Sequence, residues 1–213
     1  MKKIVSLVLL FACVISFSAC ANVDAFIEII DASEPTRIVT KTHTTIGNEK
    51  LEGEFTTLVE GDMVTFNYWY DRYAIPGVDD SENRIFRPDP SVVYYTDGKY
   101  STDAETWFPE APELGLGNIG LNLDRDYLGD FSVSNDKRTL YATLNAEQAA
   151  VVLGIDGFVV DENGVELIVK TNGTKLVNVS VSYSTGTSVV SIETSYEYVA
   201  PEAPETEEPE TQE

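Results

Sequence analysis

The chain has 213 residues, of which 36 are acidic and 14 are basic, so its formal net charge at pH 7 is −22. Such an acidic surface repels nucleic acid and the anionic face of a membrane, which excludes nucleic-acid binding and membrane attachment by charge. With 43% hydrophobic residues and two cysteines, the composition is that of a globular domain stabilised by its core rather than by a set of disulfides.

The first twenty residues have the pattern of an export signal that ends in a cysteine. Residues 1–3 carry two lysines, residues 4–17 are almost all apolar, and the segment closes on Cys20. An apolar run with a basic start and small residues near its end is typical of a secretory signal, and this one is too short to span a bilayer. The sequence therefore predicts a signal peptide over residues 1–19.

Residues 17–20, Phe-Ser-Ala-Cys, resemble the lipobox of bacterial lipoproteins, with Phe17 where leucine is usual. The resemblance implies that Cys20 is acylated, becomes the new N-terminus and, with a short linker over 20–22, holds the protein on the extracytoplasmic face of a bacterial cell membrane. Each buried methylene contributes roughly 0.8 kcal/mol, and two or more acyl chains give a stable anchor. The alternative is an ordinary signal peptide with a cysteine near its cleavage site.

Removal of the signal changes the charge and the cysteine content. Two lysines and Cys13 leave with it, so the mature chain has 12 basic residues (14 minus 2) against 36 acidic ones, a net charge of −24. Because Cys20 is expected to carry lipid, no cysteine remains for a disulfide. The domain must then be stable through its core alone, although the exported compartment permits disulfides.

β-Prone segments with short connections dominate the rest of the chain. A first helix is expected over 23–32, where apolar residues recur at helical spacing and Pro35 follows the end. Short connections favour antiparallel pairing of neighbouring strands. The expected strands are 36–46, 54–59, 63–72, 92–96, 99–102, 131–133 and 138–144, with long loops at 74–89 and 104–120 and a short turn within 121–128.

A second helix is expected after residue 144. Asn145 can cap its N-terminus, Gln148 completes a capping-box pattern, and Gly154 is suited to the left-handed end. The stripe expected to be buried consists of Ala149, Val152 and Leu153.

The last part of the chain is expected to form a meander over 166–171, 174–183 and 188–198. Asn172-Gly173 between the first two strands predicts a type I′ turn, which needs positive φ at both positions. In the second strand, Val177, Val179 and Val181 alternate with polar residues and are expected on one face, with Leu176 out of step. Val190, Ile192 and Thr194 are expected to share a face of the third strand.

Residues 200–213 are expected to form a disordered acidic tail. Residues 201–213 contain three prolines and six glutamates, which cannot bury enough apolar surface to offset the entropy of ordering. The alternative is a docking peptide for a basic partner.

The order of these elements resembles that of the LolA-like and LppX-like lipoproteins of the bacterial envelope. The resemblance covers about residues 23–199 and includes the phrases YTDGKY (95–100) and LYATL (140–144). It implies an α+β fold that is mainly antiparallel β, an open half-barrel meander with a few helices packed on its concave side. It further implies a hydrophobic cavity that holds an acyl chain or the lipid of a lipoprotein.

Aromatic side chains are the candidates for lining such a cavity, because they combine apolar area with a polar tip. The strand over 63–72 places Val64, Phe66, Tyr68 and Tyr70 on one face and Trp69 on the other, and more aromatic residues follow it. An ordinary core with cross-strand aromatic pairs is the alternative. The candidate ligand-binding residues are Phe66, Tyr68, Tyr70, Tyr94 and Trp107.

The sequence offers little catalytic or metal-binding chemistry. His43 is the single histidine and is expected to be exposed on a strand, and neither a nucleophile elbow, a phosphate loop nor a dinucleotide fingerprint is present. The acidic residues within 79–83, and Asp124, Asp126 and Asp130, lack EF-hand spacing and are expected to be solvated. We expect no metal, no cofactor and no enzymatic activity, although composition alone leaves a hydrolase with two carboxylates open.

Two non-enzymatic functions from different classes therefore lead, and a hydrolase with an acidic dyad in the loops of 74–130 is the third hypothesis. The first is a membrane-anchored lipoprotein that binds a hydrophobic ligand or lipid. The second is a non-enzymatic interaction or signalling module that recruits a protein partner of the cell envelope.

Overall fold

The computed structural model describes residues 23–73, 84–85, 89–110, 121–154 and 159–198. The predicted signal peptide, Cys20 and the predicted acidic tail lie outside the described residues, as do most of the expected loop over 74–89 and residues 111–120 of the other loop.

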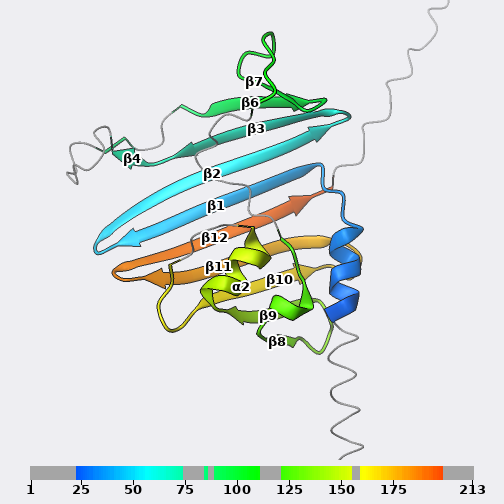
Figure 1. Ribbon diagram of the computed structural model, residues 1–213, viewed down its shortest axis with the longest axis vertical. Coiled ribbons are helices and arrows are strands. Elements are labelled where there is room, and N and C mark those ends of the chain that lie inside the picture. Colours follow the sequence, from blue (N-terminus) through cyan, green and yellow to red (C-terminus); the bar gives the residue numbers. More distant parts are fainter. Residues whose placement is uncertain (1–22, 74–83, 86–88, 111–120, 155–158, 199–213) are drawn as a thin grey trace, which may run out of the picture.

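One ten-stranded antiparallel sheet forms the framework of the domain (Figure 1), with the strand order β7-β6-β3-β2-β1-β12-β11-β10-β9-β8. A separate pair is formed by β4 (Arg72–Tyr73) and β5 (Arg84–Ile85). The strands of the large sheet are β1 (Arg37–Ile46), β2 (Glu49–Glu60), β3 (Met63–Tyr70), β6 (Ser91–Thr96), β7 (Lys99–Ser101), β8 (Asp130–Val133), β9 (Thr139–Leu144), β10 (Val165–Thr171), β11 (Leu176–Thr185) and β12 (Ser188–Glu197).

The chain builds this sheet from its middle outward and then from its far edge inward. The strands β1, β2, β3, β6 and β7 follow one another to one edge, and β8 to β12 begin at the other edge and return until β12 pairs with β1. At that junction Arg37 lies opposite Glu197, and their side chains form an ion pair of 2.7 Å. The edges β7 and β8 do not meet, so the predicted α+β fold with an open antiparallel half-barrel is confirmed.

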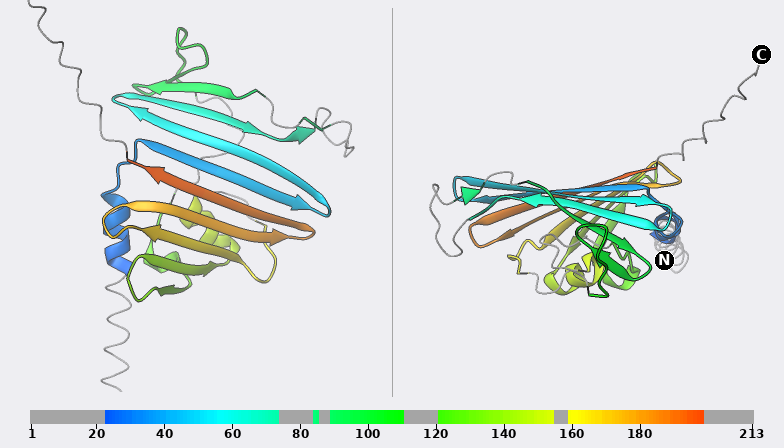
Figure 2. Two further views of the ribbon diagram at one scale, coloured as in Figure 1. Left: turned by 180° about the vertical axis from the view of Figure 1, so that it is seen from behind. Right: turned by 90° about the horizontal axis from the view of Figure 1, so that it is seen from above.

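Helices cover one face of the sheet, which we call the inner face. In the edge-on view of Figure 2, α2 (Ala146–Leu153) lies on one side of the strands. Its N-terminus has the predicted capping box, with Asn145 and Gln148 each accepting a hydrogen bond from the other's backbone N–H. Gly154 ends the helix with φ 65°. A helix over residues 23–31 and the 3₁₀ helix Arg125–Tyr127 fall in the two other segments that were expected to be helical or turned.

The helix over 23–31 is attached to the sheet at its C-terminal end. The Ser33 hydroxyl donates to the carbonyl of Ile29 (2.6 Å) and accepts from the backbone N–H of Leu176 (3.0 Å). From the other side, the Tyr198 hydroxyl donates to the carbonyl of Leu176 (2.7 Å). The start of β11 therefore joins the N-terminal helix to the residue that follows β12.

The β10–β11 hairpin forms where it was predicted, but two of its details differ. Only Gly173 of the Asn172-Gly173 pair has positive φ (99°), so the turn is not type I′. Asn172 instead accepts backbone hydrogen bonds from Thr174 and Lys175 through its side-chain oxygen, which closes a longer loop.

The second difference is a β-bulge in β11. Thr171 pairs with Leu176 and Lys170 pairs with Asn178, which leaves Val177 as the extra residue of the bulge. The bulge turns Leu176 into the core and leaves Val177 39% exposed, so the prediction that Val177 shares the buried face of Val179 was wrong. The predicted face of Val190, Ile192 and Thr194 in β12 is confirmed.

Candidate functional site

The helices divide the inner face into two parts. In Figure 1 the described helices lie over β9 to β12, and none of them lies over β2 and β3. Over β9 to β12 the inner side chains form one cluster with the helices, which fills that part of the face. The buried members of this cluster are Val23, Phe26, Leu123, Leu128, Leu140, Ala142, Leu144, Ala149, Val152, Leu153, Val165, Leu167, Val169, Leu176, Val179, Val181 and Ile192.

The other part of the inner face carries what we call the inner aromatic surface: Phe55 of β2 with Phe66, Tyr68 and Tyr70 of β3. Directly paired residues of antiparallel strands share a face, and Phe55 pairs with both Thr40 of the inner face and Tyr68. The ring of Phe55 lies 5.8 Å from that of Phe66 and 5.9 Å from that of Tyr68. Phe55 is buried, but the three side chains of β3 are only half-buried. This surface therefore offers ring area to a ligand.

The aromatic character continues toward the β7 edge of the sheet. Val93 of β6 pairs with Phe66 and is buried, and Tyr95 pairs with Val64. The ring of Tyr95 lies 4.9 Å from that of Tyr100 in β7. A continuous band of aromatic and aliphatic side chains thus crosses four strands on the inner face.

A single buried hydroxyl interrupts this apolar band. Thr57 of β2 pairs with Phe66 of β3 and with Ile38 of β1, and it is only 4% exposed. Its Oγ1 is the one side-chain polar atom that is buried without a hydrogen-bond partner among the described residues. The inner hydroxyl of Thr40, by contrast, is bonded to that of Thr194 at 3.0 Å. Most buried polar groups have a partner, so Thr57 is an exception that requires an explanation.

The structure brings together three of the five predicted ligand residues. Phe66, Tyr68 and Tyr70 all lie on the inner face of β3. Tyr94 does not belong with them, because it pairs with Thr65 and therefore lies on the outer face of β6. The prediction grouped these residues by type, whereas the period of two along a strand separates them.

Trp107 lies outside the strands, in the segment that follows β7. The neighbouring Phe108 exchanges two backbone hydrogen bonds of 2.8 Å with Tyr100, which attaches this segment to the edge of the sheet. Trp107 itself is half-buried, while Phe108 is 54% exposed. The segment that carries Trp107 is therefore attached to the sheet at Tyr100 of β7, and Trp107 does not lie on β3.

Sequence reasoning missed Phe55 and Thr57. Their position follows from the two-residue connection between Glu60 and Met63, which fixes the register of the whole β2–β3 hairpin. Counting back from that turn places Phe55 opposite Tyr68, so the position of Phe55 could have been predicted from the hairpin.

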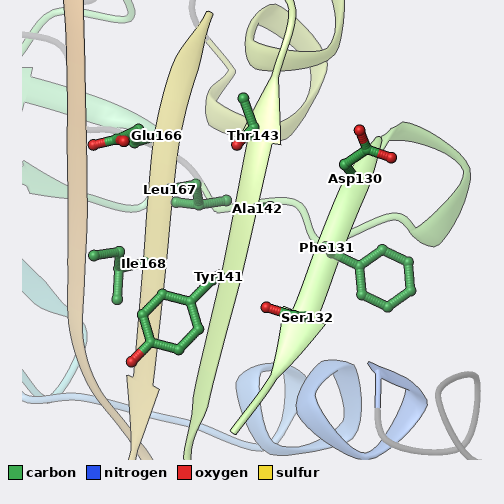
Figure 3. A pocket seen from close by; sticks show the side chains of 9 residues that line it. All are labelled: Asp130, Phe131, Ser132, Tyr141, Ala142, Thr143, Glu166, Leu167 and Ile168. Carbon is green, nitrogen blue, oxygen red and sulfur yellow. The ribbon is translucent and has the colours of Figure 1, made fainter. Parts of the chain in front are cut away.

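A shallow groove of about 360 Å³ lies at the other edge of the sheet (Figure 3). Two rows of paired residues on the outer face of the sheet line this groove. The first row contains Asp130, Thr143 and Glu166, and the second contains Ser132, Tyr141 and Ile168. Tyr141 is 47% exposed, and Figure 3 shows its ring extended from β9 toward β10. An exposed ring with two carboxylates nearby suits a cationic group, which is attracted to both.

Titratable groups with shifted pKa values occur outside the inner aromatic surface. Burial raises the pKa of Tyr196 to about 12, and the neighbouring Tyr198 adds to this shift. Hydrogen bonds from the backbone of Thr106 and Glu105 and from the Ser101 hydroxyl lower the pKa of Asp103 to about 2. These bonds close a local turn and give Asp103 a structural role.

The acidic candidates within 79–83 lie outside the described residues, and the described polar candidates form no metal-binding cluster. His43 is exposed on β1, as predicted, with its Nδ1 3.6 Å from Oε1 of Glu52. Within the described ranges, histidine, cysteine and carboxylate side chains nowhere gather in groups of three that would hold a metal ion. The same part of the chain contains no helix with the length and apolarity needed to cross a bilayer.

Comparisons with known proteins find likeness in structure. No protein-family model matches the sequence, and no curated protein matches it. Among solved structures, the chain is similar to a LolA superfamily protein from Nitrosomonas europaea, with 10% sequence identity and a TM-score of 0.31 over 86% of this chain and 94% of that one.

Proposed function

We propose that this chain is a non-enzymatic lipoprotein of the bacterial envelope that binds a hydrophobic ligand or lipid on the inner aromatic surface. The observation that carries the proposal is the contrast between the two parts of the inner face. Helices fill the part over β9 to β12, whereas the rings of Phe66, Tyr68 and Tyr70 remain half-buried on β3.

The rings supply enough apolar area for useful affinity. An aromatic side chain has about 150–250 Å² to bury, and covering the remaining half of one ring contributes roughly 2 kcal/mol at about 25 cal/mol per Å². Two rings covered by one acyl chain thus contribute about 4 kcal/mol before the entropic cost of association. The tyrosine hydroxyls can form hydrogen bonds with the polar end of a ligand.

A fluorescent fatty acid provides the direct test. We expect the purified mature protein to bind it, and we expect Phe66→Ala and Tyr68→Ala each to weaken binding about tenfold or more, as expected for roughly 2 kcal/mol. Tyr141→Ala on the outer face is the matched control and should leave the affinity unchanged. Equal affinity in all four proteins, or no binding by any of them, contradicts the proposed site.

The proposed anchor at Cys20 needs a separate experiment. The sequence of residues 17–20 supports acylation of this thiol, and the acidic surface gives no charge-based attraction to anionic lipid. We expect labelled palmitate to be incorporated in a bacterial host that processes lipoproteins, and Cys20→Ser to abolish the label. Cys13→Ser is the matched control, because Cys13 lies inside the predicted signal. Unchanged labelling of the Cys20→Ser protein would refute lipidation at this residue.

The outer groove favours a second function, the recruitment of a basic envelope protein. Tyr141 with Asp130 and Glu166 offers a ring and two carboxylates to a lysine or arginine side chain. Cross-linking can be done in cells that produce the wild-type chain, the Tyr141→Ala variant or a chain without residues 200–213. The comparison shows whether the groove or the tail binds the partner. A partner captured equally by all three forms argues against both surfaces.

A further inference from the structure

The hydroxyl of Thr57 is a polar group within the proposed ligand site that contact with an apolar chain alone does not explain. This hydroxyl is buried in the apolar band without a hydrogen-bond partner. A buried hydroxyl without a partner is destabilising, and a ligand atom that pairs with it removes this cost and gains affinity. We infer that Thr57, whose buried hydroxyl becomes accessible when the side chains over it move aside, donates a hydrogen bond to the acyl ester carbonyl of a bound amphiphile, an inference that rests on the function proposed above.

The surroundings of Thr57 select the chemistry of that group. Along β2 its inner-face neighbours are Phe55 and Val59, and across the sheet they are Ile38 and Phe66. All four are uncharged, so an ionised carboxylate would lose its hydration without gaining a cation. A neutral group is therefore favoured at this position.

Among neutral groups, an ester carbonyl fits better than a hydroxyl. A carbonyl is only an acceptor, so one hydrogen bond from Thr57 satisfies it and leaves no unpaired proton in the apolar band. A ligand hydroxyl would bring both a donor and an acceptor to a position whose four direct neighbours on the inner face are all apolar. Thr40, the next inner residue with a hydroxyl, already bonds to Thr194.

The position of Thr57 also orients the ligand. Phe55 and Phe66 lie beside it, and Tyr68 and Tyr70 follow along β3. A carbonyl at Thr57 therefore places the start of the acyl chain beside Phe66, and the chain extends over the half-buried rings of Tyr68 and Tyr70 on β3. In this arrangement the Thr57 hydroxyl binds the ester carbonyl and the aromatic rings contact the acyl chain.

Two amphiphiles of equal chain length test the inference: monolauroyl glycerol, which has an ester carbonyl, and the dodecyl ether of glycerol, which lacks it. We expect the wild-type protein to bind the ester about two- to tenfold more tightly, the ratio that one net hydrogen bond provides. Thr57→Val keeps the shape and removes the hydroxyl, so it should bind the two equally. Thr56→Val, on the outer face of the same strand, should keep the preference.

The outcomes separate this inference from the proposed function. If wild-type protein binds both amphiphiles equally, the hydroxyl does not recognise the carbonyl, and the inference fails while hydrophobic binding stands. If the ester preference persists in Thr57→Val, another group is responsible and the inference also fails. If neither amphiphile binds the wild-type protein, the proposed function fails first. A thermal midpoint of Thr57→Val at or above that of the wild type shows that the variant is folded, because it loses only an unsatisfied group.

Discussion

Gly164→Ala should destabilise the helix-covered part of the domain through a contact that the structure defines. Gly164 precedes β10 with φ +76°, and a Cβ added there would lie 2.6 Å from the carbonyl oxygen of Leu144, the last residue of β9. The left-handed conformation costs alanine about 1–2 kcal/mol. Moving the backbone of β9 away from the new methyl group adds about 1–3 kcal/mol, so the total loss is about 2–5 kcal/mol.

Gly186→Ala isolates the conformational part of this cost. Gly186 has φ +59°, and an added Cβ would meet nothing within 4 Å. We therefore expect a loss of about 1–2 kcal/mol for this variant. Urea unfolding followed by tryptophan fluorescence measures both variants, provided that the slope with denaturant stays the same. Equal losses in the two proteins would refute the reasoning, because the contact with Leu144 would then contribute nothing.

The Gly164→Ala variant also tests whether the two parts of the inner face are independent. Gly164 lies beside the helix-covered part, whereas the proposed ligand site is on β2 and β3. Under conditions in which Gly164→Ala remains folded, its affinity for the fluorescent fatty acid should equal that of the wild type. A large loss of affinity would show that the two parts are coupled.

Three further predictions concern the cap, the bulge and a buried phenol. Asn145→Ala should lower the free energy of unfolding by about 1 kcal/mol in urea titrations, because it removes the cap of α2. Leu176→Ala should cost about 2–5 kcal/mol and Val177→Ala less than about 1 kcal/mol in the same assay, and similar costs would contradict the bulge. Tyr196 ionises near pH 10 when unfolded and near pH 12 when folded, so stability should be retained below pH 10 and fall as the pH rises toward 12. Tyr196→Phe should reduce that fall in unfolding titrations at alkaline pH, and an unchanged fall would assign it to other groups.

The hairpins and helices were predictable because their signals are local. The turn at Asp97-Gly98 has both residues at positive φ (48° and 76°), as a tight hairpin requires. The cap of α2 is likewise determined by residues three apart in sequence. Such features depend on neighbours that the sequence itself places side by side.

The remaining features depend on pairings that local patterns do not reveal. The face of Tyr94 follows from its partner in β3, more than twenty residues earlier in the chain. The bulge at Val177 depends on how β11 aligns with β10, and the apolar character of Leu176 and Val177 is equal in the sequence. The inner aromatic surface was half predictable for the same reason: the aromatic residues of β3 are evident in the sequence, whereas the position of Thr57 beside Ile38 and Phe66 depends on strand pairing.

The ion pair between Arg37 and Glu197 has a mechanical consequence. These two residues begin β1 and end β12, and they lie directly opposite one another in the central ladder. A pulling force applied to both would load the hydrogen bonds one after another, as in opening a zipper, instead of shearing them together. A pull on the two ends of the domain would first load the contacts of Ser33 and Tyr198 with Leu176, which lie outside these strands, and the β1–β12 ladder would then open at low force.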